Sequence, residues 1–200
     1  MTDVESFVQF CESDFGRTVM DREAAYLEQF VTTDDRVLDI GAGIGSIEER
    51  LSDHDIIGLD ISEEMVRTAR TRVDCPFLVG DARSLPIADN VVDAVFFVAT
   101  LEFIPEIEAV LDETVRVLCP DGTVIALILN TRSEYVQSNL ERKGSYFQWM
   151  KHRDMEALTA VVEEYIEARS EYILGIADEK VFETDDPTEA AMLAISGSPR

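Results

Sequence analysis

The order of hydrophobic and polar positions predicts alternating strands and helices between residues 36 and 130. Short apolar runs that end at glycine or acidic residues predict strands, and the amphipathic stretches between them predict helices. The expected strands are 36–40, 56–60, 76–79, 91–98 and 123–129. The run 91–98 is almost entirely apolar, which is typical of a strand buried on both faces. This alternation predicts a parallel sheet with helices on both sides.

The two ends of the chain have other patterns. Residues 4–31 predict two helices with a break at 14–17, and a polar, aromatic stretch fills 131–149. A further helix is expected over 154–168, followed by strands at 171–176 and 190–195. No linker separates these parts, so we expect one domain over residues 1–200. It divides into N-terminal helices (1–35), a ligand-binding core (36–130), and a region with a lid, the last helix and a closing hairpin (131–200).

A glycine-rich turn follows the first expected strand. Asp39 ends that strand, and Gly41, Gly43 and Gly45 follow at every second position. Glycine tolerates positive φ and has no Cβ, so a ligand can lie directly against the backbone. Open α/β sheets bind ligands at this end of their strands. Position 46 is serine, which departs from the glycine or alanine of the dinucleotide fingerprint.

Acidic residues also end the next two strands. Asp60 lies 21 residues after Asp39. A carboxylate at this place can accept hydrogen bonds from both hydroxyls of a ribose. Asp81 can accept a hydrogen bond from the exocyclic amine of adenine, while the backbone N–H of Ala82 can donate one to a ring nitrogen. The alternative is that both are ordinary turn aspartates. Together with the glycine turn, they predict an adenosine-containing ligand.

These features together resemble the class I S-adenosylmethionine-dependent methyltransferases. The resemblance covers residues 36–130 and rests on motifs in the family's order, which are 39–45, 58–62, 80–82, Asp93 and 116–122. Asp121 stands where the family usually has glycine, a mild departure. The family's fold is Rossmann-like and α/β, a doubly wound, seven-stranded, mostly parallel sheet. Its C-terminal β-hairpin brings the last strand in antiparallel, as strands 171–176 and 190–195 are expected to do.

The resemblance implies S-adenosylmethionine as the cofactor. The glycine backbone would hold its methionine part, Asp39 would orient the ammonium, and Asp60 would bind the ribose. Met65 either packs on the adenine or is an ordinary core methionine. The residues assigned to the cofactor are Asp39, Gly41, Gly43, Gly45, Asp60, Ile61, Met65, Asp81, Ala82 and Val98.

The sequence says less about the part of the site that would bind the methyl acceptor. Residues 99–104 should face the methyl group, and they lack the N/D-P-P-Y/F sequence of enzymes that methylate planar amino groups. Glu102 is the candidate catalytic residue, because it could orient a substrate or accept a proton; the alternative is a carboxylate at a helix start. The residues expected to line the substrate pocket are Leu101, Tyr146, Trp149 and His152. Ordinary packing is the alternative for the aromatic residues, and a structural role for His152.

Composition narrows the partners. The formal net charge is −24, from 41 acidic and 17 basic residues, which disfavours nucleic acid and anionic membranes as partners. An acidic chain poor in lysine is also typical of salt-loving archaea, so we expect a halophilic protein. No apolar run approaches the roughly 18 residues of a membrane span, and no signal peptide is evident, so a cytoplasmic location is expected. Three scattered cysteines predict neither disulfides nor a metal site.

The sequence therefore predicts a methyltransferase that uses S-adenosylmethionine to methylate a small-molecule acceptor. Two alternatives stay open. One is a non-catalytic protein that only binds the cofactor, because no indispensable catalytic side chain is visible. The other is an NAD-dependent oxidoreductase, which Ser46 and the closing hairpin disfavour. The acceptor atom, the need for a general base and the oligomeric state are left open.

Overall fold

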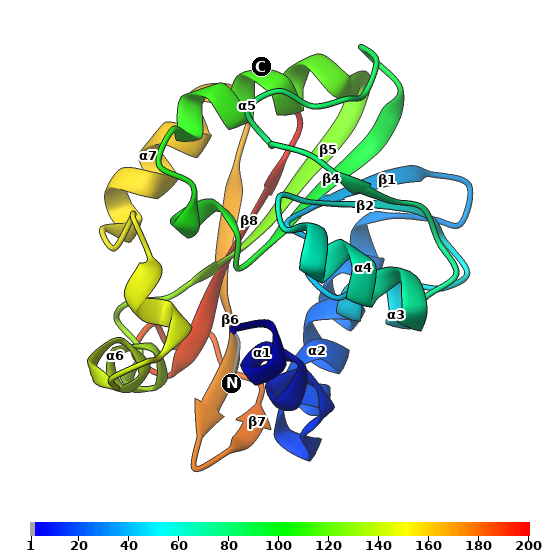
Figure 1. Cartoon of the computed structure of the whole chain (residues 1–200). Coiled ribbons are helices and arrows are strands. Elements are labelled where there is room, and N and C mark those ends of the chain that lie inside the picture. Colours follow the sequence, from blue (N-terminus) through cyan, green and yellow to red (C-terminus); the bar gives the residue numbers. More distant parts are fainter. Residues whose placement is uncertain (1–2) are drawn as a thin grey trace.

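The computed structural model describes residues 3–200 and contains one eight-stranded sheet with helices on both faces (Figure 1). Residues 1 and 2 of the expected domain lie outside the described part. The strands are β1 (Arg36–Ile40), β2 (Asp55–Asp60), β3 (Phe77–Val79), β4 (Val92–Val98), β5 (Leu118–Leu129), β6 (Arg169–Ala177), β7 (Lys180–Phe182) and β8 (Ala190–Gly197). The α-helices are α1 (Asp3–Glu12), α2 (Asp14–Leu27), α3 (Ser46–Arg50), α4 (Glu63–Arg72), α5 (Ile107–Val117), α6 (Glu134–Glu141) and α7 (Met155–Tyr165). Short 3₁₀ helices are η1 (Glu28–Phe30), η2 (Leu101–Phe103) and η3 (Tyr146–Trp149).

The strand order is β3-β2-β1-β4-β5-β8-β6-β7. Strands β1 to β5 are parallel to one another, and β8 lies antiparallel between β5 and β6. This confirms the doubly wound, mostly parallel sheet and its antiparallel last strand. The expected number of seven strands was wrong, because β7 adds an eighth. A two-residue turn at Asp178 and Glu179, both with positive φ, folds β7 back on β6.

Two apolar layers enclose the sheet. Helices α5 and α7 pack on one face, against residues such as Leu38 and Phe97. Helices α2 and α3 pack on the other face, against residues such as Val37 and Phe96. Successive residues of one strand point to opposite faces, so β1 and β4 need apolar side chains on both. The expected doubly buried strand over 91–98 is confirmed.

Three expected boundaries were wrong. Helix α6 and the short helix η3 occupy 131–149, where the sequence indicated no regular element; Ser133 caps α6 by accepting a hydrogen bond from the Val136 N–H. The expected break at 14–17 lies inside α2, because the Ser13 side chain already caps that helix. Strand β5 starts at Leu118 rather than 123, beside a register shift in its pairing with β4.

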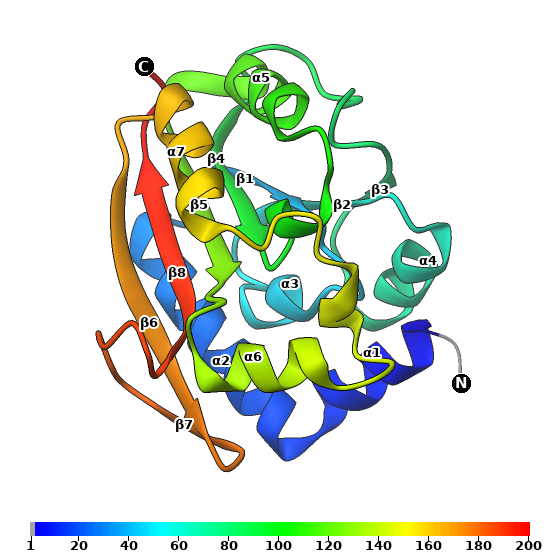
Figure 2. The ribbon, with the colours of Figure 1, turned by 90° about the vertical axis from the view of Figure 1, so that its left-hand side faces the viewer.

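The N-terminal helices and the α6–η3 segment meet at one end of the sheet (Figure 2). Residues from α1, α2, α6 and η3 line one cavity together with the carboxyl ends of β1, β2 and β4. The topology thus brings together the first, middle and last thirds of the chain around the glycine turn. Within residues 3–200, no helix combines the length and apolar character needed to cross a membrane.

Candidate functional site

The cavity has a volume of about 600 Å³ and lies where strands β1, β2 and β4 end. Its floor is the glycine turn after β1 and the loops after the neighbouring strands. Its roof comes from the N-terminal helices and from the segment that contains α6 and η3. Parallel strands end at one edge of the sheet, so the loops that follow them converge there.

The glycine turn places backbone at the cavity wall. Gly41, Gly43 and Gly45 have φ of +87°, +56° and +80°, a region that other residues rarely adopt. A Cβ at Gly41 would overlap the side chain of Thr100, which follows β4. Gly41 and Gly43 line the cavity, whereas Gly45 caps α3 and lies against Phe77 below the surface. Of the three glycines that the sequence analysis assigned to the cofactor, the cavity lining thus includes Gly41 and Gly43 but not Gly45.

Asp60 is fixed by two backbone hydrogen bonds. Its Oδ2 accepts from the N–H of Gly43 at 2.9 Å, and its Oδ1 accepts from the N–H of Ser62 at 2.8 Å. Burial raises the pKa of Asp60, while these two bonds oppose the shift. Each oxygen retains a lone pair, so the carboxylate can still accept two hydroxyl groups. Ile61, 69% exposed, and Met65 lie beside it on the cavity wall.

Asp39 lies deeper and is only 2% exposed. Its Oδ1 is buried and receives no hydrogen bond from the described residues unless Glu48 carries a proton. Burial, followed by the charge of Asp60, raises the pKa of Asp39 to about 7. Burial, and then the charge of Asp39, raises the pKa of Glu48 well above its usual value, and a protonated Glu48 can donate to Asp39. A cationic ligand group would compensate this buried acid.

Asp81 lines the cavity but already has a partner. Its two oxygens accept from Arg83 Nε at 3.0 Å and from Arg83 Nη2 at 2.7 Å, and Oδ1 also accepts from the Arg83 N–H. These hydrogen bonds lower the pKa of Asp81 to about 2. Adenine recognition by Asp81 stays a prediction, and Arg83 would have to share the carboxylate. Ala82 and Val98, two other expected cofactor residues, also line the cavity.

Two of the four expected substrate-binding residues lie on the cavity wall. Tyr146 and Trp149 line it, and the Tyr146 ring stacks on Phe103 with ring centroids 4.8 Å apart. The Phe7 ring of α1 meets the edge of Tyr146 at 6.3 Å. The expected aromatic lid therefore contacts the N-terminal helices as well as the loop after β4.

Among the described residues, the cavity lining does not include Leu101, Glu102 or His152. Leu101 belongs to the core packed against α5 and α7. Glu102 is buried, its Oε1 accepts from the Leu129 N–H at 2.8 Å, and burial raises its pKa to about 7. The His152 ring bonds to the Ile104 carbonyl at 2.8 Å. The carbonyl of Glu102 accepts from the N–H groups of Lys151 and His152, so these residues attach the lid segment to η2.

Several cavity residues were not expected from the sequence. They come from the N-terminal helices, the loop after β4, the lid and its helix; the main ones are Phe7, Phe10, Met20, Glu23, Thr100, Tyr135 and Arg142. For Glu23 a signal existed, because it lies four residues from both Val19 and Leu27 on the apolar face of α2. A charged residue on an apolar face indicates either a buried pair or a ligand contact.

Comparisons with known proteins agree with this geometry. Residues 38–126 match the family described as "Methyltransferase domain". A demethylmenaquinone methyltransferase of Renibacterium salmoninarum is 40% identical over 93 residues, which are 45% of this chain and 39% of that protein. An arsenite methyltransferase of Halobacterium salinarum is 35% identical over 99 residues, or 44% of this chain and 25% of that protein. The chain thus spans less than half the length of these curated relatives.

The likeness in fold extends over the whole chain. The crystal structure of a SAM-dependent methyltransferase of Thermotoga maritima, titled a possible histamine N-methyltransferase, has a TM-score of 0.79. The match covers 98% of this chain and 96% of that one at 22% identity, so it bears on the fold alone. These findings agree with the resemblance: the chain has the fold of an S-adenosylmethionine-dependent methyltransferase, and residues 38–126 are similar to a methyltransferase domain.

The family and the fold imply S-adenosylmethionine as the cofactor, and the residues present fit it. The left-handed glycine turn leaves backbone accessible, and Asp60 keeps free lone pairs for a ribose. Asp39 Oδ1, apart from a protonated Glu48, and Ser46 Oγ are buried polar atoms that receive no hydrogen bond from the described residues. Both residues line the cavity, where the amino and carboxylate groups of a methionine would give them partners.

Proposed function

We propose that the protein is a methyltransferase that transfers a methyl group from S-adenosylmethionine to a small-molecule acceptor. The observation that carries the proposal is one continuous cavity, which runs from Gly41 and Asp60 to the aromatic residues Phe103 and Tyr146. A cofactor seated on the glycine turn would occupy one part of it. The aromatic part would then receive the acceptor.

The cofactor supplies a methyl group on a sulfonium, which is activated without a metal. The chain's own residues bind, align and exclude water. Gly41, Gly43 and Asp39 would hold the methionine part, Asp60 the ribose, and Asp81 with Ala82 the adenine. The rings of Tyr146 and Phe103 cover the cavity from the side of the lid and β4. Enclosure of the reacting groups by apolar rings keeps water from competing with the acceptor.

The wall of the aromatic part favours an acceptor with a substantial apolar body. Its side chains come from α1, α6, η3 and the closing strands, and include Phe7, Tyr135, Phe147, Leu174, Ile176 and Met192. Matched curated proteins are named for acting on demethylmenaquinone and on malonyl-acyl-carrier protein, which supports an acceptor other than nucleic acid. The net charge of −24 also disfavours a polyanionic substrate such as nucleic acid.

Two measurements test the proposal. Titration calorimetry should show that S-adenosylhomocysteine binds in a 1:1 ratio while NADH does not. The protein is then incubated with methyl-labelled S-adenosylmethionine and a fractionated metabolite extract, with the Asp60→Ala variant as the control. A labelled small molecule that forms only with the unaltered protein would support the proposal. Cofactor binding without any labelled product would favour the non-catalytic binding protein, and tight NADH binding would favour the oxidoreductase.

A further inference from the structure

Glu23 of α2 is a buried acid that the cofactor motifs do not explain. Its side chain lines the cavity, it is 2% exposed, and its Oε2 has no hydrogen-bond partner among the described residues. A carboxylate in such surroundings is costly unless a cation or a donor meets it. The neighbouring residues on the same face of α2, such as Val19 and Leu27, are apolar. An unpartnered carboxyl group at a cavity wall therefore indicates a ligand group.

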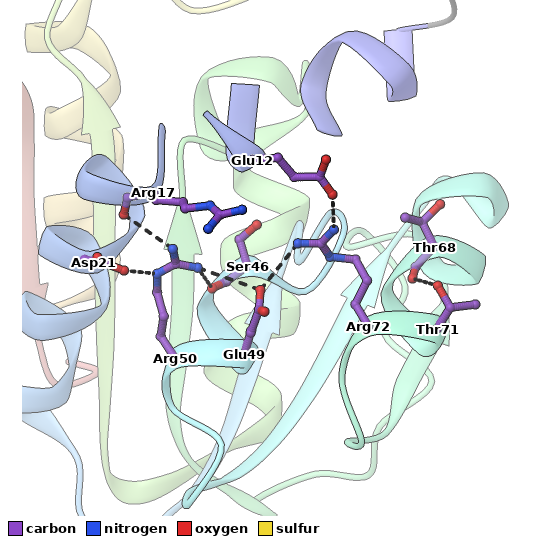
Figure 3. Close-up of polar contacts among 9 residues, drawn as sticks. All are labelled: Glu12, Arg17, Asp21, Ser46, Glu49, Arg50, Thr68, Thr71 and Arg72. Atoms are coloured by element: carbon purple, nitrogen blue, oxygen red, sulfur yellow. Dashed lines mark hydrogen bonds and ion pairs between the residues drawn. The ribbon is translucent and has the colours of Figure 1, made fainter. Parts of the chain in front are cut away.

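The cation whose charge acts on Glu23 is already engaged by other groups. Arg50 partly compensates Glu23, but its guanidinium donates to Asp21 Oδ1 at 2.6 Å, to the Ser46 carbonyl at 2.8 Å and to the Arg17 carbonyl at 3.3 Å (Figure 3). These three bonds direct Arg50 toward the start of α3 and the outer part of α2. Glu23 is thus left with the field of Arg50 but without a hydrogen bond from it.

The other titratable groups whose charges interact with Glu23 are acids or neutral, and the cation Arg142 lines the same cavity. The interacting groups come from four elements packed against α2 or across the cavity, and are Asp39 of β1, Cys11 of α1, Tyr135 of α6 and Tyr146 of η3. Burial, and then Asp39, raises the pKa of Glu23 to about 8 against the opposing effect of Arg50. Since the pKa of Asp39 is about 7, each of the two acids is protonated in part of the free protein around neutral pH.

We infer that Glu23 and Asp39 together bind the α-ammonium group of the methionine part of the cofactor, one carboxyl group from the N-terminal helices and one from β1. The inference rests on the proposed function, because it uses S-adenosylmethionine as the ligand. Asp39 precedes the glycine turn that would hold the methionine, so a cation beside Asp39 also lies within the field of Glu23. One ammonium between two acids removes their mutual repulsion and gives Glu23 its missing partner.

The first test compares two ligands that differ at the group concerned. S-adenosylhomocysteine carries the amino acid part, and 5′-methylthioadenosine carries the adenosine and the sulfur without it. By calorimetry, we expect Glu23→Gln to weaken S-adenosylhomocysteine binding about 10- to 100-fold and to change methylthioadenosine binding by less than twofold. Glu28→Gln removes the same charge from an exposed residue just beyond α2 and should change neither.

The second test uses the unaltered protein and a proton count. Titrations of S-adenosylhomocysteine at pH 7.5, repeated in buffers of different ionisation enthalpy, should show net proton release, because the ammonium ionises Glu23 and Asp39. Glu23→Gln should reduce that release, and methylthioadenosine should release fewer protons than S-adenosylhomocysteine.

Three results would overturn the inference. In the first, Glu23→Gln binds S-adenosylhomocysteine with an affinity within twofold of that of the unaltered protein. In the second, Glu23→Gln loses the same affinity for both ligands. In the third, the unaltered protein releases no protons when S-adenosylhomocysteine binds. The first result would mean that Glu23 does not contact the amino acid part of the cofactor. An unaltered protein that binds neither ligand would contradict the proposed function itself.

Discussion

The carboxylate of Asp60 accepts a hydrogen bond from the backbone N–H of Gly43 at 2.9 Å, which ties the glycine turn after β1 to the end of β2. The same carboxylate accepts from the N–H of Ser62, the residue that caps α4. Asp60 therefore connects the glycine turn after β1 with the loop after β2, and both would bind the cofactor. Its expected contact with the ribose and its structural role are linked through one side chain.

Removal of the Asp60 carboxylate should weaken cofactor binding. We expect Asp60→Ala to lower the affinity for S-adenosylhomocysteine by about 1–3 kcal/mol, because ribose hydroxyls and the Gly43 N–H lose their acceptor. Asp60→Asn keeps one acceptor oxygen and should lose less. Calorimetry gives the affinities, and circular dichroism establishes that the fold is intact. Unchanged affinity in a folded Asp60→Ala protein would refute the ribose assignment.

Asp81 and Arg83 offer a test of adenine recognition. If Asp81 contacts the adenine amine, Asp81→Ala should lower S-adenosylhomocysteine affinity by about 1 kcal/mol, the value of a typical hydrogen bond. Arg83→Ala should leave the affinity equal or raise it, because it releases the carboxylate from its bidentate partner. Equal losses in the two variants would mean that the Asp81–Arg83 pair, and not Asp81 alone, shapes this part of the site.

Glu102 should make stability depend on pH. Burial raises its folded pKa from 4.5 to about 7, so the folded state binds more protons than the unfolded state between these values. Its contribution to the free energy of unfolding is therefore largest below pH 4.5 and falls as pH rises to about 7, by about 3 kcal/mol in all. Glu102→Gln should flatten this dependence in urea unfolding curves measured from pH 5 to 8. An identical pH profile in the variant would contradict the buried, protonatable Glu102.

Glu102→Gln also separates a positioning role from a catalytic one. If Glu102 only accepts the hydrogen bond from the Leu129 N–H, the amide of Glu102→Gln can replace it and the variant should keep most of the methyl transfer rate. If Glu102 takes a proton from the substrate, the variant should lose that rate, and the pH profile of kcat should lose its acidic limb. The absence of Glu102 from the cavity lining of the described chain favours the first result.

Arg50 should be a main attachment of the N-terminal helices. It is 18% exposed at its side chain and joins α3 to α2 through Asp21 and the Arg17 carbonyl (Figure 3). We expect Arg50→Ala to lower the free energy of unfolding by about 1–3 kcal/mol and to weaken S-adenosylhomocysteine binding, because α2 forms one wall of the cavity. The control is Arg67→Ala, which removes an exposed pair with Glu63 and should cost less than about 0.5 kcal/mol. Equal losses of stability in the two variants would show that the Arg50 contacts stabilise the fold no more than an exposed ion pair does.

Salt should stabilise the fold. A net charge of −24 on 200 residues produces self-repulsion that counter-ions screen, and the Debye length falls from about 10 Å at 0.1 M to about 3 Å at 1 M salt. We expect the Tm to rise by several degrees over this range of KCl. Sodium sulfate at matched ionic strength shows how much of the rise comes from stronger apolar burial. Equal stability without salt would contradict the halophilic character inferred from the composition.

The sequence by itself determined the features that depend on neighbouring residues. Apolar runs ending in Asp39 and Asp60, and glycine at every second position of the turn, are local signals. Each predicts a backbone conformation and a place at the end of a strand. Because parallel strands all end at one edge, their order was enough to predict that the glycine turn, Asp39 and Asp60 lie close together, as they do in the cavity lining. The core from 36 to 130 was predictable for this reason.

Only the tertiary structure decided which distant side chains meet. Glu23 lies in the cavity because α2 packs beside α3, and Asp81 is engaged because Arg83 folds back on it. Glu102 lies under the lid rather than in the cavity because its carboxylate accepts the Leu129 N–H from β5. The eighth strand and helix α6 were missed because Asp178-Glu179 is an unusual turn sequence and 131–149 lacks a clear apolar period. Local pattern sets the backbone, whereas the partners of a buried charge depend on packing between segments far apart in the chain.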